Sequence, residues 1–290
     1  MTDARYGPED ARVVGADPWL ERRLDHPEDV AVGEDCLYAG GEDGQVYRID
    51  SETGAVETLA DTGGFVLGVT VGPAGDLYVC DFQRHAVLRL PLDGGTPGEL
   101  HTVVEGGPAD PPWHPNYAVF DRAGRLYVSD SGDRSDMADA GGCVYVVDPH
   151  GRGRVLTRAP SAFPNGLALS EDDTLYVAET GAERVTAVGI EGGEATDTWT
   201  ATEEMGLVDG LAFDAEGRLY GASLGDDAVY RLDDGVETLV HDPEGLTVGN
   251  PTNLAFGGPE MHTLYIANLG LWHLTAVDID ARGRPPTPPA

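Results

Sequence analysis

The sequence predicts an all-β protein, a six-bladed β-propeller whose blades are four-stranded antiparallel sheets. A Leu-Tyr pair recurs along the 290 residues at intervals of 40 to 49 residues, with the tyrosines at Tyr38, Tyr78, Tyr127, Tyr176, Tyr220 and Tyr265. A period in this range is typical of propellers and solenoids. Short apolar runs separated by turns with glycine or aspartate favour β repeats, and no segment carries a sustained helical apolar period.

Each Leu-Tyr pair ends a hairpin-like unit, which is clearest in the fourth repeat, FPNGLALSEDDTLYVAET (Phe163 to Thr180). A short apolar strand, Leu167 to Leu169, leads into the acidic turn Glu171 to Asp173, and a second strand covers Leu175 to Ala178. Apolar β-formers on both sides of a tight polar turn are typical of a hairpin. Versions of this unit precede the other five tyrosines, so six blades account for nearly the whole chain.

In chain order, the blades are expected to start near residues 28, 66, 116, 165, 209 and 252 of a single domain spanning 1–290. The first blade has further strands near Gln45 to Ile49 and Ala55 to Leu59. The longest loop, Ser131 to Gly142, lies between the second and third strands of the third blade. Long loops at a ligand face often gate it, so this loop is a lid candidate. Residues 1–10 and 281–290 are expected to be loose.

The sixth blade shows only three strands. Its last strand, within Trp272 to Ile279, is followed by ARGRPPTPPA, where proline lacks the N–H group that a sheet needs. Two β-like pieces, ARVV and WLERRL, lie between Ala11 and Leu24, ahead of the first blade. One of them is expected to supply the missing outer strand and close the ring, and WLERRL is the first choice.

The charge balance is strongly acidic. The chain has 18 basic residues, all of them arginine, against 51 acidic residues, which gives a net charge of −33. The acidic residues are scattered through the turns of every blade, which favours an adaptation to very high salt over an acidic patch for one basic partner. No basic stripe is present to neutralise phosphates, so a nucleic acid is not expected as a partner.

The three cysteines, Cys36, Cys80 and Cys143, are odd in number, and their spacing does not fit a metal site. Two of them flank Leu-Tyr strands, where a buried free thiol is expected. The opening MTDARYGPED is polar, unlike a secretory leader, and no apolar run is long enough to span a bilayer. We therefore expect a cytoplasmic protein, in the high-salt cytoplasm of a halophile, without a membrane partner.

Aligning the hairpins places one residue per blade at the entrance to the innermost strand: Glu28, Leu67, Asn116, Asn165, Asp209 and Thr252. The innermost strands of a propeller surround its central channel, so these residues are expected to form a ring at one height. Four of the six are Asp, Glu or Asn, whose oxygen atoms suit a hard divalent cation. The alternative is that each residue caps the backbone before its strand. Four such residues at one register favour a metal site.

A second ring lies three residues after each tyrosine: Gly41, Asp81, Asp130, Glu179, Ser223 and Asn268. These residues end the second strands on the same face as the first ring. Two interpretations stay open for them. They are either ordinary acidic turn residues or supports that orient the asparagine ligands.

The chain resembles the gluconolactonase, senescence-marker and luciferin-regenerating family of six-bladed propellers over residues 20–280. The resemblance is strongest in HPNYAVFDRAGRLY, FPNGLALSEDDTLYVAET, VDGLAFDAEGRLY and TNLAFGGPEMHTLY. It implies that a Glu of the first blade, one Asn from each of two middle blades and an Asp of a later blade hold one divalent metal ion. These residues are Glu28, Asn116, Asn165 and Asp209. Ca²⁺ is the expected ion, and Mg²⁺, Mn²⁺ or Zn²⁺ are alternatives.

The same resemblance implies a hydrolase of lactones or related esters, with the metal as Lewis acid in the central channel. Asp209 is the expected catalytic residue, because it would orient or deprotonate the attacking water. His114, Asn116 and Tyr117 are the expected contacts of a small-molecule substrate, and His114 is an alternative base. Sugar lactonases of the family usually read RPND where this chain reads HPNY, which departs from the pattern for an aldonolactone.

Other functions stay open. HPEDVAV in the first blade and VAET at Val177 to Thr180 resemble the strictosidine-synthase-like branch, some members of which lack the metal. A phosphotriesterase-like propeller enzyme and a non-catalytic binding scaffold are further alternatives, because a fold does not imply a function. A serine hydrolase is not expected, since no G-x-S-x-G elbow is present.

Overall fold

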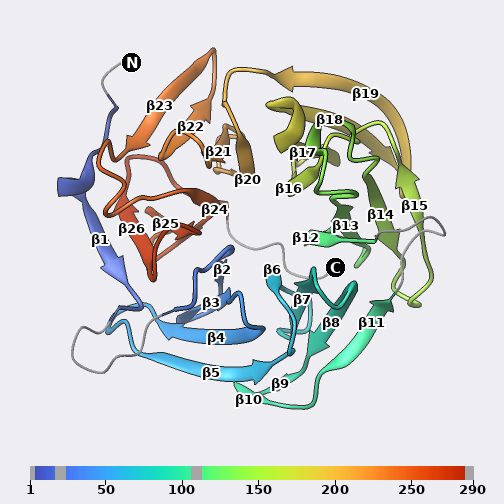
Figure 1. Ribbon diagram of the computed structural model, residues 1–290, viewed down its shortest axis with the longest axis horizontal. Coiled ribbons are helices and arrows are strands. Elements are labelled where there is room, and N and C mark those ends of the chain that lie inside the picture. The colour runs from blue at the N-terminus through green and yellow to red at the C-terminus, as the bar shows by residue number, and fades with distance from the viewer. Residues whose placement is uncertain (1–3, 17–23, 106–112, 285–290) are drawn as a thin grey trace.

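The computed structural model describes residues 4–16, 24–105 and 113–284 (Figure 1). Its strands form six four-stranded antiparallel sheets around a central axis, and β9 (Leu92–Asp93) and β10 (Thr96–Pro97) form a small extra sheet. The helices of the described ranges are short 3-10 turns, namely η1 (Pro8–Asp10), η2 (Met137–Asp139) and η3 (Thr180–Ala182). None of these helices has the length or apolar character to cross a membrane. The predicted six-bladed propeller is confirmed.

Five blades run from an innermost to an outermost strand within one stretch of chain. The first blade consists of β2 (Ala31–Val32), β3 (Cys36–Gly40), β4 (Gln45–Asp50) and β5 (Val56–Asp61), and the second of β6 (Val66–Val71), β7 (Leu77–Asp81), β8 (Ala86–Leu90) and β11 (His101–Glu105). The third consists of β12 (Pro115–Phe120), β13 (Leu126–Asp130), β14 (Cys143–Val147) and β15 (Gly153–Thr157), and the fourth of β16 (Pro164–Leu169), β17 (Thr174–Glu179), β18 (Arg184–Glu191) and β19 (Glu194–Thr202). The fifth consists of β20 (Val208–Phe213), β21 (Leu219–Ser223), β22 (Ala228–Leu232) and β23 (Val236–His241).

The sixth blade joins the two ends of the chain. It consists of β24 (Pro251–Gly257), β25 (Thr263–Asn268), β26 (Leu274–Asp278) and, as its outer strand, β1 (Ala11–Val14). In this pairing Ala11 lies opposite Val277, and Val14 lies opposite Leu274. Closure of the ring by an N-terminal strand is therefore confirmed (Figure 1).

The choice of WLERRL as the closing strand was wrong, because ARVV takes that place. Its two valines suit an edge strand, with Val14 buried against the core and Val13 half exposed on the other face. Residues 19–23 of the WLERRL piece lie outside the described residues. Its last residue, Leu24, is fully buried in the same apolar cluster as Val14.

Both ends of the chain form backbone hydrogen bonds where they are described. The Tyr6 N–H group donates to Leu239 O at 2.9 Å, and Tyr6 O accepts the N–H group of His241 at 3.2 Å. At the other end, Arg282 O accepts the N–H group of Ala215, and Gly283 N–H donates to Met261 O. These hydrogen bonds connect the described residues of both ends to other parts of the propeller. Residues 1–3 and 285–290 lie outside the described chain.

The recurring D-x-x-G-R-L-Y sequence forms a compact turn that explains the repeat. In the third blade, Asp121 Oδ1 accepts the N–H groups of Ala123 and Arg125, both at 2.9 Å. Asp121 Oδ2 accepts Arg125 Nε at 2.5 Å and the Tyr127 hydroxyl at 3.1 Å. Gly124 has a φ angle of 77°, which favours glycine. The fifth blade repeats this arrangement around Asp214, so one carboxylate shapes the turn and anchors the buried tyrosine.

Candidate metal centre and active site

A cavity of about 270 Å³ opens at the end of the channel where the innermost strands begin. Figure 1 shows these strands, β2, β6, β12, β16, β20 and β24, around the centre of the ring. Glu28, Asn116, Asn165 and Asp209 all line this cavity, although they come from four different blades. The structure thus brings together the four residues predicted to be metal ligands.

Irregular strand pairing accompanies three of these side chains at the cavity. Pro115 pairs with Asp130, but the next pair along is Ala118 with Val128, so the innermost strand carries one extra residue. The register shifts in the same way at the start of β16 and of β20. Such a bulge bends the strand and re-aims a side chain. Asn116, Asn165 and Asp209 each lie within the irregular stretch.

A glycine directly follows two of the candidate ligands, namely Gly166 after Asn165 and Gly210 after Asp209. A Cβ atom at Gly166 would overlap the carbonyl oxygen of Asp209, and one at Gly210 would overlap Asn253. These glycines allow neighbouring innermost strands to approach closely, so the ring of ligands stays narrow.

Hydroxyl groups hold the two asparagine side chains in one orientation. Asn116 Nδ2 donates to Ser131 Oγ at 3.0 Å, and Asn165 Nδ2 donates to Thr180 Oγ1 at 3.2 Å. Each hydroxyl in turn donates to a backbone carbonyl of the next blade, at 2.9 Å and 2.8 Å respectively. Because each amide nitrogen is used in this way, the amide oxygen is left to bind a cation.

The second predicted ring has a different task from orienting asparagines. Four of its members accept backbone N–H groups of the segments that precede the innermost strands: Asp81 from Phe65, Asp130 from His114, Glu179 from Ala162, and Asn268 from Gly249. They fasten these segments to the second strands. Asn116 and Asn165 are instead held by Ser131 and Thr180, which directly follow Asp130 and Glu179 of this ring.

Three carboxyl groups lie close enough to interact at this cavity: Asp29 and Asp209 are buried, and Glu28 is half-buried. Burial, together with the charges of the nearby Glu42 and Asp29, raises the pKa of Glu28 to about 8. Burial also raises the pKa of Asp29 to about 7, against the lowering effect of two backbone N–H groups. Asp209 has a pKa well above its ordinary value, because of burial and then the charges of Glu28 and Asp29.

No cationic side chain of the described residues forms an ion pair with these three carboxyl groups. Asp29 accepts the N–H groups of Val30 and Val69 at 2.6 Å and 2.5 Å, whereas Glu28 and Asp209 accept no hydrogen bond from the described chain. Buried negative charge without a partner is unfavourable unless a cation neutralises it. The residues present therefore fit a divalent metal ion.

Aligning the six hairpins of the sequence did not predict two polar residues of this region, Asp29 and Asn253. Asp29 directly follows Glu28, and Asn253 directly follows Thr252, which had been placed in the ring but does not line the cavity. Asn253 does line it, and its side chain hydrogen-bonds Tyr117. An alignment that takes one residue per blade cannot find them. The signal available was the pair of adjacent acidic residues, Glu28 and Asp29, in one short segment.

The predicted substrate contacts divide into two groups. Asn116 and Tyr117 line the cavity, whereas His114 does not. The His114 ring stacks on Phe82, with 4.3 Å between ring centroids, and its Nδ1 atom lies 2.7 Å from Gly132 O. Burial lowers the pKa of His114, which favours the neutral imidazole. His114 therefore packs against Phe82, which lines the cavity, and this position does not favour the role of a catalytic base.

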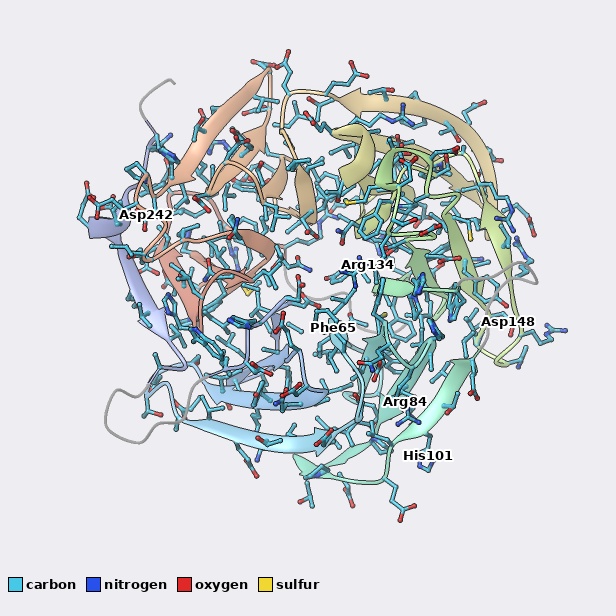
Figure 2. The ribbon with its side chains drawn as sticks, viewed as in Figure 1. Phe65, Arg84, His101, Arg134, Asp148 and Asp242 are labelled. Carbon is cyan, nitrogen blue, oxygen red and sulfur yellow. The ribbon has the colours of Figure 1, made fainter. Side chains whose placement is uncertain are left out.

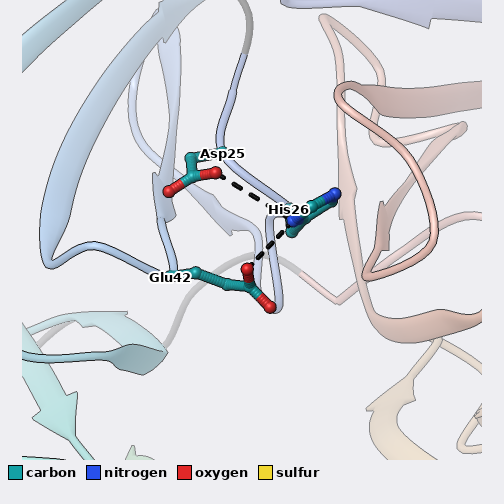
Figure 3. A group of neighbouring side chains, drawn as sticks. All are labelled: Asp25, His26 and Glu42. Atoms are coloured by element: carbon teal, nitrogen blue, oxygen red, sulfur yellow. Dashed lines mark hydrogen bonds and ion pairs between the residues drawn. The ribbon is translucent and has the colours of Figure 1, made fainter.

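The lid candidate does lie at the cavity mouth. Arg134 and Met137 of the loop Ser131 to Gly142 line the cavity, and the Arg134 guanidinium lies 5.8 Å from the centroid of the Phe82 ring. Figure 2 shows Arg134 and Phe65 close to the centre of the ring of blades. The loop also packs on the next blade, because a Cβ atom at Gly181 would overlap the backbone of Met137.

The fold and the site together define a propeller with an acidic, oxygen-rich centre, and comparison with known proteins shows its family. Residues 38–269 match the model of the SMP-30/gluconolactonase/LRE-like region. The chain therefore belongs to this family. Residues 15–49 also match the N-terminal part of the strictosidine synthase-like family.

Particular relatives fit this assignment. The pentonolactonase XacC of Haloferax volcanii is 29% identical over 238 residues, which cover 79% of this chain and 75% of XacC. A solved gluconolactonase structure from Xanthomonas campestris is 25% identical with a TM-score of 0.74, over 93% and 90% of the two chains. The structure of a calcium-binding protein, regucalcin from Agrobacterium tumefaciens, has a TM-score of 0.76 at 19% identity over 97% of both chains, which shows the shared fold. The chain spans about half the length of some other curated relatives.

Proposed function

We propose that this protein is a metal-dependent hydrolase of lactones or related carboxylic esters. The cation would be held by Glu28, Asn116, Asn165 and Asp209, with Ca²⁺ as the first choice and Mg²⁺, Mn²⁺ or Zn²⁺ as alternatives. The observation that carries the proposal is the convergence in one cavity of two carboxyl groups, which have no ion-pair partner among the described residues, with two pre-oriented asparagines. The names of XacC and of the Xanthomonas gluconolactonase support a lactone substrate, and that of regucalcin supports calcium.

When bound, a divalent cation supplies Lewis-acid stabilisation of the negative charge that develops on the carbonyl oxygen. Asp209 would orient the attacking water and accept its proton as the oxygen bonds to the carbonyl carbon. The ring C–O bond then breaks, and the leaving alkoxide takes up a proton to give the hydroxy acid. Burial raises the pKa of Asp209, which suits a proton acceptor, while a neighbouring cation would lower that pKa again.

The remaining residues position these groups. Ser131 and Thr180 fix the asparagine amides, and Asp29 lies beside Glu28 with both carboxylate oxygens engaged by backbone N–H groups. Asn116 and Tyr117 would contact the substrate at the side of the cavity. His114 would act through Phe82 and not as the base.

A second candidate is strictosidine-synthase-like chemistry, which the match over residues 15–49 favours. Some strictosidine-synthase-like proteins lack the metal, and a metal-free protein would have no need for four oxygen ligands facing one cavity. A phosphotriesterase-like enzyme shares the metal-dependent arrangement and would differ only in substrate. A binding scaffold would need neither metal nor turnover.

The test is metal analysis of the purified protein combined with a hydrolysis screen. Lactones, aryl esters and phosphotriesters are each assayed with and without a chelator, and metals are added back one at a time. We expect about one divalent ion per chain and lactone turnover that the chelator abolishes and Ca²⁺ restores. Turnover that survives complete removal of metal would overturn the metal-dependent mechanism, and preferred phosphotriester turnover would replace the lactonase proposal.

A further inference from the structure

In three blades an apolar lining residue directly follows the second strand, and a backbone hydrogen bond joins it to the segment before the innermost strand. In the second blade, Phe82 N–H donates to Phe65 O at 2.9 Å. In the fifth and sixth blades, Leu224 and Leu269 donate in the same way to the segments before β20 and β24, at 3.0 Å and 3.1 Å. Because a sheet carries each pair, these side chains have fixed positions above the floor.

Most of the side chains in this upper part of the cavity are apolar. Seven side chains of Phe, Leu and Met line the cavity: Phe65, Leu67, Phe82, Met137, Phe163, Leu224 and Leu269. They come from five of the six blades, and all except Phe82 are partly exposed to solvent. Apolar side chains that converge on a cavity while open to water indicate a ligand site, since their exposure is otherwise unfavourable.

The polar groups of the cavity are largely occupied. Thr180 Oγ1 accepts Asn165 Nδ2 and donates to Val208 O, so it has little capacity left. Asn253 Oδ1 accepts the N–H group of Leu254, and the Asn253 side chain also bonds Tyr117. The proposed metal ligands would be committed to the cation. Arg134 at the mouth is the one lining cation among the described residues.

A sugar lactone would fit this cavity poorly. Its several hydroxyl groups would lose their hydrogen bonds to water and find few free partners, which is unfavourable. An alkyl or aryl group would instead gain from leaving water against the phenylalanine and leucine side chains. We propose that the substrate is a lactone whose ring carries an apolar alkyl or aryl substituent, held by this upper wall. This inference rests on the proposed lactonase function and specifies its substrate class.

The proposal is tested with three δ-lactones that share one ring: δ-valerolactone without a substituent, δ-decalactone with an alkyl chain, and glucono-δ-lactone with hydroxyl groups. The metal-loaded full chain should show a kcat/KM for δ-decalactone at least about tenfold above that for glucono-δ-lactone. Leu224→Asn should lower the ratio of kcat/KM for δ-decalactone to that for δ-valerolactone by about tenfold. Leu246→Asn is the matched control, because Leu246 is 66% exposed and does not line the cavity.

Preference for glucono-δ-lactone, or an unchanged ratio in Leu224→Asn, would overturn the inference. A second measurement does not depend on turnover, namely titration calorimetry with the ring-opened acids hydroxydecanoate and gluconate. Tighter binding of hydroxydecanoate, weakened by Leu224→Asn, supports the apolar wall even if no lactone is hydrolysed, in which case only the lactonase proposal fails. Equal or tighter binding of gluconate contradicts the inference whatever the turnover.

Discussion

Single residues would decide how strongly the proposed metal site binds a cation. Glu28 and Asp209 are carboxyl groups without a protein partner among the described residues, whereas Asn116 and Asn165 are neutral and already oriented by hydroxyl groups. The charged pair should therefore supply most of the attraction to a divalent ion. Asn116 and Asn165 should instead fix the positions of two oxygen atoms around the ion.

The first prediction compares these two kinds of ligand. Asp209→Ala should weaken metal binding more than Asn165→Ala, because it removes a charge as well as an oxygen atom. Either change should reduce turnover by about 10³-fold or more, since transition-state charge stabilisation of several kcal/mol is lost. Glu28→Gln keeps the shape of the side chain and removes its charge. Metal content and kcat are measured for each purified variant, and circular dichroism checks the fold.

Full metal occupancy and normal turnover in Asp209→Ala would show that the metal centre lies elsewhere. The scaffold interpretation would then gain support. All three variants should still fold, because these side chains line a cavity and do not belong to the apolar clusters between blades.

The second prediction concerns pH in the absence of metal. The pKa of Glu28 is raised from 4.5 to about 8 and that of Asp29 from 3.8 to about 7. Between the ordinary and the raised pKa values, the folded protein holds protons that the unfolded chain has released. Their contribution to stability is therefore fully present below the ordinary pKa values and is lost as the pH rises through 7 to 8. The thermal midpoint of the chelated protein should fall over this range.

Added Ca²⁺ should reverse this fall, because a cation replaces the protons. Glu28→Gln removes one of the titrating groups and serves as the control, and it should flatten the profile of the chelated protein. A chelated wild-type midpoint that stays level or rises between pH 4.5 and pH 8 would contradict the predicted protonation of the site.

The third prediction concerns a positioning residue. Thr180→Val keeps the size of the side chain and removes the hydroxyl that accepts Asn165 Nδ2. Metal affinity should fall about 10- to 100-fold, since loss of such an outer hydrogen bond usually has this effect. Thr180→Ser retains the hydroxyl and should restore affinity. Equal affinities of the Val and Ser variants, measured by calorimetry, would mean that the hydroxyl does not orient the ligand.

Individual strands have separate roles in this propeller. The irregular starts of three innermost strands bring the candidate ligands Asn116, Asn165 and Asp209 to the channel, and β1 closes the ring from the opposite end of the chain. Without β1, the edge of β26 would be unpaired, and Val14 would leave the cluster that it shares with Leu274.

The fourth prediction tests this closure. Deletion of residues 1–16 should destabilise the protein by about 2 kcal/mol or more, because the burial of Val14 alone contributes about that much and the strand hydrogen bonds add to it. Deletion of residues 285–290 serves as the control and leaves every described strand in place. Chemical unfolding of both truncated proteins measures the difference. Equal stabilities would rule out a structural role for β1.

The whole molecule carries a net charge of −33, which no local contact offsets. Several arginines are used in turns, as in the pairs of Arg125 with Asp121 and Arg218 with Asp214, and most acidic groups in the part of the chain that the structure describes have no such partner. The compact state therefore suffers self-repulsion that dissolved salt screens. We propose on this basis that the protein works in the high-salt cytoplasm of a halophile.

The fifth prediction follows from that repulsion. The thermal midpoint should rise steeply from dilute buffer to molar KCl or NaCl, and the protein should lose structure on dilution. Non-ionic osmolytes at equal osmolality control for effects other than screening. A midpoint that does not respond to salt would count against the halophilic interpretation.

The repeated local pattern was enough to predict the fold and the four candidate ligands. Alternating apolar residues, the turn built by Asp121 or Asp214 and the spacing of the tyrosines are properties of short segments, and each acts within its own hairpin. Because a propeller places equivalent hairpin positions at one height around the channel, aligning the repeats also placed Glu28, Asn116, Asn165 and Asp209 at one cavity.

Contacts between distant segments determine the features that the repeats did not predict, namely the closing strand and the positions of His114 and Asn253. Both N-terminal pieces have β character, and only packing of Val14 beside Leu274 selects ARVV as the closing strand. His114 is two residues from a predicted ligand, yet the stacking on Phe82 places it behind the cavity wall. Asn253 reaches the cavity where Thr252 does not. These outcomes depend on bulges, on side-chain direction and on neighbours from other blades, which a pattern within one segment does not contain.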